Sequence, residues 1–389
     1  LCITILLIIC YGCYKRYKNK YLEGYFLGDR QMPWWLVLLS IMGTQASAIT
    51  FLTAPGQAYT DGMRFVQYYF GLPLAMVVLC IFFLPVFHKL KLFTAYEFLE
   101  KRFDLKTRML TSFLFLISRG LSTGISIFAP SLVLHSMLGW DIYWTNIFMG
   151  GLLIIYTVGG GAKAVAYTQQ LQFIIIYAAM FIAGYYAIMS IPKDFTFTDI
   201  LHVAGKSGKL NIITKGMTDN AFDWKDRYNI WSGIIGGFFL ALSYFGTDQS
   251  QVGRYLTAKN INESRKGLLM NGIVKVPLQF LILLIGIFVF VYYIFFNAPA
   301  FFNNKLEQQV LQTAYAKKYI DLNYSYQIIQ NEKKNSVAGL KDAVQNNIKD
   351  SINYYRRQLL LSENNSKLVR NDIKQLIQLA LPGTDTNDT

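Results

Sequence analysis

Long apolar runs separated by short polar connections fill the first three quarters of the sequence. A helix needs about 20 mostly apolar residues to cross the hydrocarbon core of a bilayer. The runs that approach or exceed this length predict transmembrane helices at 33–53, 65–87, 110–138, 142–158, 167–191, 230–252 and 268–296. A further apolar run at 1–14 is too short to cross, and we interpret it as a helix whose start is missing.

The composition agrees with a polytopic membrane protein. Hydrophobic residues make up 53% of the 389 residues and charged residues only 15%, whereas a soluble domain carries roughly 25% charged residues. An ordinary soluble enzyme and a disordered chain are therefore excluded. The net charge of +14 would suggest a nucleic-acid partner in a soluble protein. Beside this apolarity we expect it to mark membrane orientation, with the lipid bilayer and no nucleic acid as partner.

Basic residues cluster in every second connection between the predicted spans. By the positive-inside rule these connections face the cytoplasm. We therefore predict a multi-pass protein of the plasma (inner) membrane, with the loop 192–229 and the tail 297–389 on the extracytoplasmic side. The cytoplasmic connections carry Lys15, Arg16, Lys18, Lys20, Arg30, Lys89, Lys91, Lys101, Arg102, Lys106, Arg108, Lys163, Arg254, Lys259, Arg265 and Lys266.

Two of the predicted spans are interrupted by small and polar residues, at 43–50 in the first span and at 242–251 in the sixth. Polar groups at this depth are costly unless they line a cavity or pair inside the bundle. The two spans stand five apart and cross in opposite directions, as the lead helices of an inverted repeat do when they are broken at the midplane. Close packing through small residues is the alternative, but it explains two matched interruptions less well than one.

Helices broken at the midplane suit ion-coupled transport. An interruption frees backbone carbonyls to coordinate a cation and N–H groups to hold a polar or anionic ligand. We therefore predict a cation-coupled transporter of a small polar or anionic solute. Its candidate substrate-binding residues in these two spans are Gln45, Ser47, Thr50, Tyr244 and Asp248.

Four segments resemble the sodium/solute symporter family. They are FLGDRQMPWW at 26–35, TAYEFLEKRF at 94–103, YTVGGGAKAV at 156–165 and DQSQVGRYLTAK at 248–259. The resemblance covers about residues 24–296, with the segments in order and at the expected spacing. A further segment, ISIFAPSL at 125–132, is more similar to the iodide, monocarboxylate and vitamin branch than to the sugar branch.

This resemblance implies an all-α polytopic membrane protein with the five-plus-five inverted repeat of the leucine transporter. The implied activity is not enzymatic: it is solute import by alternating access, with the sodium ion co-transported. We expect the repeat to be incomplete, with the leading helix clipped and the second repeat truncated after its second helix. The expected segments are a partial leading helix and basic cytoplasmic loop at 1–32, the first repeat of five helices at 33–191, an extracytoplasmic loop at 192–229, the first two helices of the second repeat at 230–296, and an extracytoplasmic helical hairpin with a disordered end at 297–389.

The resemblance also implies roles for individual residues. The sodium site would use the backbone carbonyls of Gly43 and Ala46, together with hydroxyls on an eighth core helix that this sequence lacks. Tyr244 corresponds to an inner-gate tyrosine, and Lys275 corresponds to a lysine on the substrate side. Gln169 stands where the family often has an acidic residue, which weakens the case for a second cation there. The Asn and Gln contacts of the sugar members do not carry over, so a sugar substrate is not expected.

Three charged residues allow more than one interpretation. Asp248 could contact a cation or the solute, or it could pair with a nearby base such as Arg254. Lys275 could bind the solute or extend to the membrane interface. Arg119, inside the third span, could bind an anionic solute or form an internal ion pair. The histidines indicate no metal site, so sodium is the only metal ion expected.

Apolar residues recur at three- and four-residue steps at 340–359 and, more weakly, at 306–317. This pattern predicts two amphipathic helices in a hairpin, which we expect to pack on itself rather than to cap the outer vestibule. The alternative function for the whole chain is a solute-binding membrane sensor built on a transporter fold, with this tail as its reporter.

Overall fold

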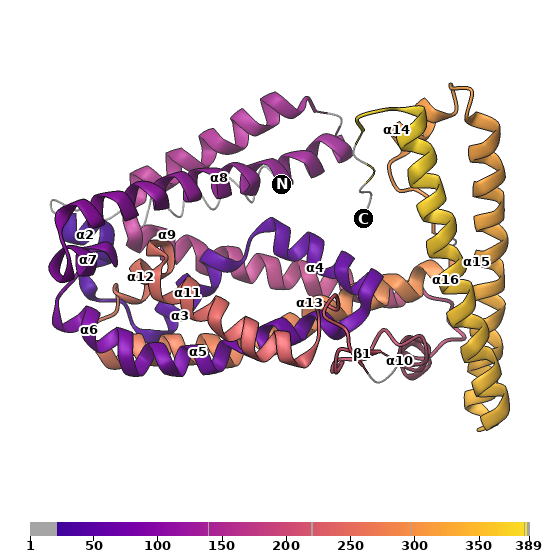
Figure 1. Ribbon diagram of the computed structural model, residues 1–389, viewed down its shortest axis with the longest axis horizontal. Helices are drawn as coiled ribbons and strands as arrows, with labels where there is room; N and C mark the ends of the chain where they lie inside the picture. Colours follow the sequence, from indigo (N-terminus) through magenta and orange to yellow (C-terminus); the bar gives the residue numbers. More distant parts are fainter. Residues whose placement is uncertain (1–21, 139, 219–220, 297, 385, 387–389) are drawn as a thin grey trace. The chain divides into compact units, whose positions relative to one another are not determined.

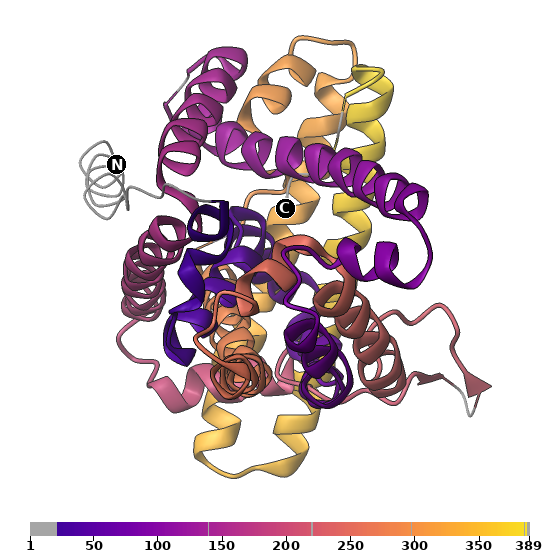
Figure 2. The same cartoon turned by 90° about the vertical axis from the view of Figure 1, so that its left-hand side faces the viewer.

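The computed structural model describes residues 22–138, 140–218, 221–296, 298–384 and 386, so the run at 1–14 lies outside the described residues. The described chain is mostly helical, with irregular connections and a small antiparallel hairpin of β1 (Met217–Thr218) and β2 (Ala221–Phe222) (Figures 1 and 2). The chain divides into two compact units. The first contains the described residues up to Ala54 with Phe65–Phe181 and Ile213–Ile282, and the second contains Pro55–Arg64, Ile182–Ile212 and the described residues from Leu283 onward.

Helices build both units, and α4, α9 and α13 each contribute residues to both. In chain order the helices are α2 (Leu22–Leu27), α3 (Trp34–Gln45), α4 (Ala48–Asp61), α5 (Leu72–Val78), α6 (Leu84–Lys89), α7 (Tyr96–Arg102), α8 (Leu105–Leu138), α9 (Ile142–Met189), α10 (Phe197–Lys206), α11 (Gly237–Thr247), α12 (Gln249–Tyr255), α13 (Ile261–Phe295), α14 (Asn304–Val310), α15 (Ala316–Gln345) and α16 (Lys349–Ala380).

Each predicted span between residues 33 and 296 falls mainly on helical residues. Among the described residues, the helical stretches that are long and apolar enough to cross a membrane are Thr50–Lys89, Leu105–His135, Gly161–Met189 and Ile261–Phe295. Shorter apolar helices in the described chain are Trp34–Gln45, Ile142–Ile155 and Ser232–Thr247. Almost none of the most apolar part of Leu105–His135 or of Gly161–Met189 is buried, and apolar surface of this extent fits contact with lipid.

α9 consists of two helices joined at a glycine. Gly161 has φ 64° and ψ −175°, a conformation that residues with a Cβ rarely adopt. A Cβ at this position would also lie 3.0 Å from the carbonyl oxygen of Tyr25. The predicted spans at 142–158 and 167–191 lie on the two sides of this junction.

Glycines bring α5 and α11 into direct backbone contact in the first unit. A Cβ added at Gly71, which precedes α5, would lie 2.1 Å from the amide nitrogen of Phe238. A Cβ added at Gly237 would lie 2.4 Å from the carbonyl oxygen of Tyr68. Real Cβ atoms essentially never approach other atoms so closely, so both positions require glycine.

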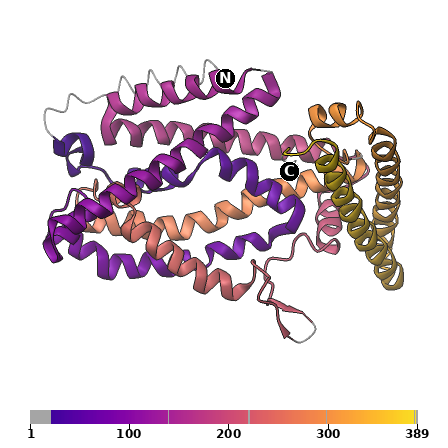
Figure 3. The same cartoon turned by 45° about the horizontal axis from the view of Figure 1, so that its top comes forward.

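In the second unit, α15 and α16 form a hairpin and lie side by side along their length (Figure 3). The structure differs from the sequence pattern here, because the single helix expected at 340–359 is divided by a turn. Asn347 adopts a left-handed φ of 54°, and the amide of Ile348 donates to the carbonyl of Ala343 (3.0 Å), as is common at helix ends. The apolar pattern continues across the turn because α15 and α16 each bury one apolar face against the other helix of the hairpin.

Gly71→Ala is expected to lower the free energy of unfolding by about 2–3 kcal/mol, because the added methyl group has no space between two backbones. The measurement is the thermal unfolding midpoint of the purified chain in detergent. Gly120→Ala is the matched control, since a Cβ at this α8 position meets no atom within 4 Å. That control should leave the midpoint unchanged or raise it slightly. Equal midpoints for the two variants would contradict the backbone contact.

Candidate functional site

Helices α3 and α4 are separated by Ala46 and Ser47, which are not helical. In a continuous helix, the amide of Ser47 would donate to the carbonyl of Gly43, and the amide of Thr50 would donate to the carbonyl of Ala46. Instead, the Ser47 amide donates to the Gln45 carbonyl (3.0 Å) and the Thr50 amide donates to the Ser47 hydroxyl (3.4 Å). The carbonyls of Gly43 and Ala46 therefore lose their helical partners.

Neighbouring side chains stabilise this break. Ser47 caps the first turn of α4 with its hydroxyl, which is the usual role of serine at a helix N-terminus. Gln169 of α9 packs against the last turn of α3, where a Cβ added at Gly43 would lie 2.9 Å from the Gln169 side-chain carbon. The hydroxyl of Ser40 donates to the Gln169 side-chain oxygen (3.1 Å). A neutral amide thus occupies the position at which the resemblance led us to look for an acidic residue.

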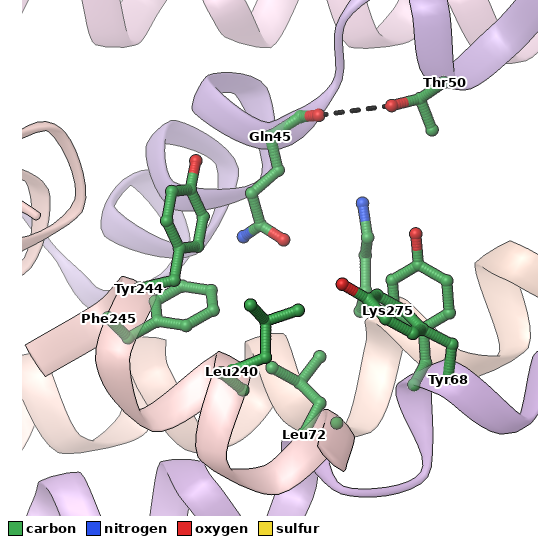
Figure 4. A pocket seen from close by; sticks show the side chains of 11 residues that line it. Gln45, Thr50, Tyr68, Leu72, Leu240, Tyr244, Phe245 and Lys275 are labelled. Carbon is green, nitrogen blue, oxygen red and sulfur yellow. Dashed lines mark hydrogen bonds between the residues drawn. The ribbon is translucent and has the colours of Figure 1, made fainter. Parts of the chain in front are cut away.

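A cavity of about 310 Å³ lies beside this break, within the first unit (Figure 4). Four predicted site residues line it: Gln45 of α3, Thr50 of α4, Tyr244 of α11 and Lys275 of α13. The other residues predicted at the break are not part of the lining. The remaining lining residues are mostly aromatic or aliphatic: Tyr68, Tyr69, Leu72, Gly237, Leu240, Ala241 and Phe245.

Lys275 carries a buried charge into this cavity. The residue is only 3% exposed, and Figure 4 shows its ammonium group pointing into the cavity beside Gln45. Among the residues that the structure describes, no hydrogen bond or ion pair satisfies this group, and the nearest compensating group is the ring of Tyr69, with its centroid at 5.9 Å. A buried charge without a partner is costly. The cavity therefore favours a negatively charged occupant, and the burial disagrees with the alternative in which Lys275 extends to the membrane interface.

Amide and hydroxyl groups from three helices complete the polar part of the cavity. The Gln45 side-chain amide donates to the side-chain oxygen of Asn271 (3.3 Å), which leaves the Gln45 side-chain oxygen directed toward the cavity (Figure 4). The Thr50 hydroxyl donates to the Gln45 carbonyl (3.4 Å), and the Tyr244 hydroxyl accepts a hydrogen bond from Gln251 (2.8 Å). The cavity thus offers one cationic group and several groups able to bind a hydroxyl, amide or carboxylate.

Asp248 forms the second break but does not line the cavity. It separates α11 from α12 in an extended conformation and caps α12 by accepting a hydrogen bond from the Ser250 amide (2.8 Å). Arg119 of α8 lies 2.9 Å from each carboxylate oxygen of Asp248 and also contacts the Ser250 hydroxyl. Both side chains are about a quarter to a third exposed. The structure therefore pairs Asp248 with Arg119, which is the internal ion pair allowed for Arg119, and the base that approaches Asp248 is more distant in the sequence than the Arg254 named as an example.

The two breaks come at different distances along their helices. α3 runs from Trp34 to Gln45 before the first break, a length of about 18 Å. The apolar helix Ser232–Thr247 is uninterrupted before Asp248, a length of about 24 Å, which is most of the hydrocarbon thickness of a bilayer. The helical stretch before the second interruption is therefore about 6 Å longer than the stretch before the first, and the matched midplane position of the two breaks stays a prediction.

Sequence analysis did not single out Tyr68, Tyr69 or Leu240 as site residues. Aromatic residues near the end of a span are typical of an interfacial belt, and a leucine in an apolar run carries no sign of a binding site. The glycines at 71 and 237, which bring these residues together, are visible in the sequence. Their large separation along the chain gives no indication that they are in contact.

Comparison with models of protein families matches residues 25–319 to the model described as "Sodium:solute symporter family". This chain belongs to the sodium:solute symporter family. Among its curated relatives is the human sodium/iodide cotransporter, 30% identical over 273 residues, covering 70% of this chain and 41% of that protein. Human sodium-coupled monocarboxylate transporter 1 is 32% identical over 251 residues, covering 64% of this chain and 40% of that protein. This symporter-family chain therefore spans about two fifths of the length of these relatives.

A third curated relative, the putative sodium-dependent multivitamin transporter of Drosophila melanogaster, is 30% identical over 271 residues, covering 69% of this chain and 44% of that protein. Among solved structures, a Na+-coupled sialic acid symporter, described as substrate-bound and outward-open, aligns with a TM-score of 0.67 at 24% identity. The alignment covers 99% of this chain and 75% of that chain. This likeness establishes the fold, and the relatives confirm both the predicted family and the predicted branch. The family and these relatives are transporters and not enzymes.

The Arg119–Asp248 pair is expected to stabilise this symporter-family chain by about 1–2 kcal/mol, because the charge-assisted contacts are mostly shielded from solvent. Arg119→Gln and Asp248→Asn should each lower the unfolding midpoint in detergent. The double variant should cost less than the sum of the two, since each single change leaves one charge without its partner. Strictly additive losses would show that the two groups do not interact.

Proposed function

We propose that this chain is the core of a sodium-coupled secondary active transporter that imports a small anionic solute by alternating access. The observation that carries the proposal is the buried, uncompensated ammonium of Lys275 in a cavity beside a broken helix. The family membership supports transport as the activity. The positively charged Lys275 in the cavity supports a negatively charged solute.

A small anion suits the size and chemistry of the cavity. Its volume of about 310 Å³ is at the lower end of the range for small-molecule sites. A carboxylate or a halide at Lys275 would offset the cost of the buried charge. Gln45, Thr50 and Tyr244 would bind the rest of a larger solute. Two of the relatives are named for anions, iodide and monocarboxylate, in agreement with this choice.

We place the sodium ion at the carbonyls of Gly43 and Ala46. Neither carbonyl has its helical donor, since the amides that would supply it donate elsewhere. Carbonyl oxygens at an unwound helix are the donors that transporters of this architecture use for sodium, and hard cations prefer oxygen ligands. The hydroxyl of Ser47, in the same turn, is a further oxygen that could face the ion or the solute.

The same proposal includes the membrane arrangement. Residues 33–191 would form the first repeat of five helices and 230–296 the first two helices of the second. The loop 192–229 and the hairpin 297–389 would lie on the extracytoplasmic side of the plasma membrane. A sensor built on the same fold is less favoured, because the relatives described above are all named as transporters.

Lys275→Met is expected to weaken anion binding at least about tenfold, because one charge-assisted contact is lost. The same change should stabilise the ligand-free chain by about 1–3 kcal/mol, since an apolar side chain replaces an uncompensated buried charge. The measurement is the unfolding midpoint of the purified chain in detergent, titrated with sodium iodide and with sodium lactate. Lys266→Met is the matched control, because Lys266 is an exposed lysine of the same helix. A Lys275→Met chain that binds the anions as well as the unaltered chain would refute the role of Lys275.

Replacing sodium by choline should abolish the stabilisation by iodide or lactate, because the anion and the cation bind to neighbouring parts of one site. In cells that express the full-length protein, uptake of the same anions should fall to background when choline replaces sodium. Uptake that persists at the same rate in choline would contradict sodium coupling.

A further inference from the structure

Lys209, in the second unit, is a buried lysine whose contacts join several segments. It follows α10 and is 5% exposed. Its ammonium donates to the carbonyls of Tyr59 (2.9 Å) and Thr60 (2.6 Å), in the last turn of α4. It also lies 4.6 Å from the centre of the Phe290 ring of α13. A carboxylate oxygen of Glu363, in α16, is 3.7 Å away.

The backbone of Lys209 contacts the same end of α4. The amide of Met63 donates to the Lys209 carbonyl (2.8 Å). Gly62, directly after α4, has φ 79°, and a Cβ there would lie 2.6 Å from the same carbonyl oxygen. The last carbonyls of a helix have no partner within the helix, and a cation beside them opposes the helix dipole. Lys209 therefore caps α4 with its side chain and holds the following turn with its backbone.

Glu363 is shared between two lysines of the second unit. Lys333 of α15 approaches it to 2.7 Å, closer than Lys209. Burial alone would raise the pKa of Glu363, but the charges of Lys333 and Lys209 hold this pKa below its usual value. Burial lowers the pKa of Lys209 to about 8, against the opposing effect of Glu363. At neutral pH the cluster thus contains a carboxylate between two ammonium groups. Two further charges affect the pKa of Lys209: Lys367 of α16 lowers it and Asp61 of α4 raises it.

We propose that Glu363 and Lys209 form a latch through which the α15–α16 hairpin restrains the C-terminal end of α4. All the contacts of this latch lie within the second unit, which includes α4 from Pro55 onward. Lys209 is then a positioning residue, which holds the C-terminal end of α4.

The test is hydrogen–deuterium exchange of the purified 389-residue chain in detergent, without added ligand. Glu363→Gln removes the negative charge from the latch and keeps the shape of the side chain. Amides at 54–63 should then exchange about tenfold faster, the scale expected for losing one contact between charged groups, while amides in the middle of α15 and α16 stay protected. Lys209→Met should give the same pattern, and Lys209→Arg, which keeps the charge, should restore most of the protection.

Two controls separate the latch from a general loosening of the hairpin. Asp194→Asn removes the carboxylate charge that lies 3.4 Å from the Lys341 ammonium of α15 and keeps the backbone carbonyl to which Lys341 also donates. This ion pair also joins the hairpin to the 182–212 segment but does not involve Lys209. It should leave exchange at 54–63 unchanged. Lys333→Met removes the competing lysine and leaves Glu363 to Lys209 alone, so exchange at 54–63 should stay the same or become slower.

Unchanged exchange at 54–63 in Glu363→Gln would overturn the latch. Acceleration of the same size in Lys333→Met or in Asp194→Asn would overturn it as well, because it would show that any weakening of the hairpin frees α4. The readout needs neither sodium nor a solute, so its outcome does not depend on the proposed function.

Discussion

The backbone groups of a helix that crosses a membrane must be satisfied by the protein, because the hydrocarbon core offers no water. The gap between α3 and α4 meets this constraint through a serine cap and the support of Gln169. It leaves two carbonyls without helical donors, close to a cavity that also holds an uncompensated ammonium group. Carbonyl oxygens and an ammonium group therefore lie in one region of the first unit. A bound cation would supply the carbonyls with a partner, and a bound anion would compensate the buried charge of the ammonium group.

The two buried lysines show how differently the protein treats the same group. Lys209 has carbonyls, a carboxylate and an aromatic ring around its ammonium, so its burial is compensated within the fold. Among the described residues, the contact found for the Lys275 ammonium is the face of Tyr69, with its ring centroid at 5.9 Å. Packing and capping account for the burial of Lys209. The proposed anion in the cavity would account for the burial of Lys275.

How much could be predicted from the sequence depended on whether the relevant signal was local. The interruption at 43–50 is visible because polar residues replace apolar ones within a single run, and the same stretch is broken in the structure. The partner of Asp248 could not be predicted, since Arg119 is 129 residues away and Arg254 offered a nearer base. The burial of Lys275 was equally hidden, because a lysine about two turns into the predicted span 268–296 could face a lipid headgroup or a cavity. At 340–359, the apolar pattern concealed a turn whose two sides pack in one hairpin.

The glycine contact between α5 and α11 has a consequence for how this fold can move. Side chains that interdigitate can slide past one another by changing rotamers, but two backbones in contact have no such freedom. We therefore expect the segments around Gly71 and Gly237 to move together, with Tyr68, Tyr69 and Leu240 keeping similar mutual distances. The interruptions at Ala46–Ser47 and at Asp248 are then the places where we expect the flanking helices to change direction as the cavity opens.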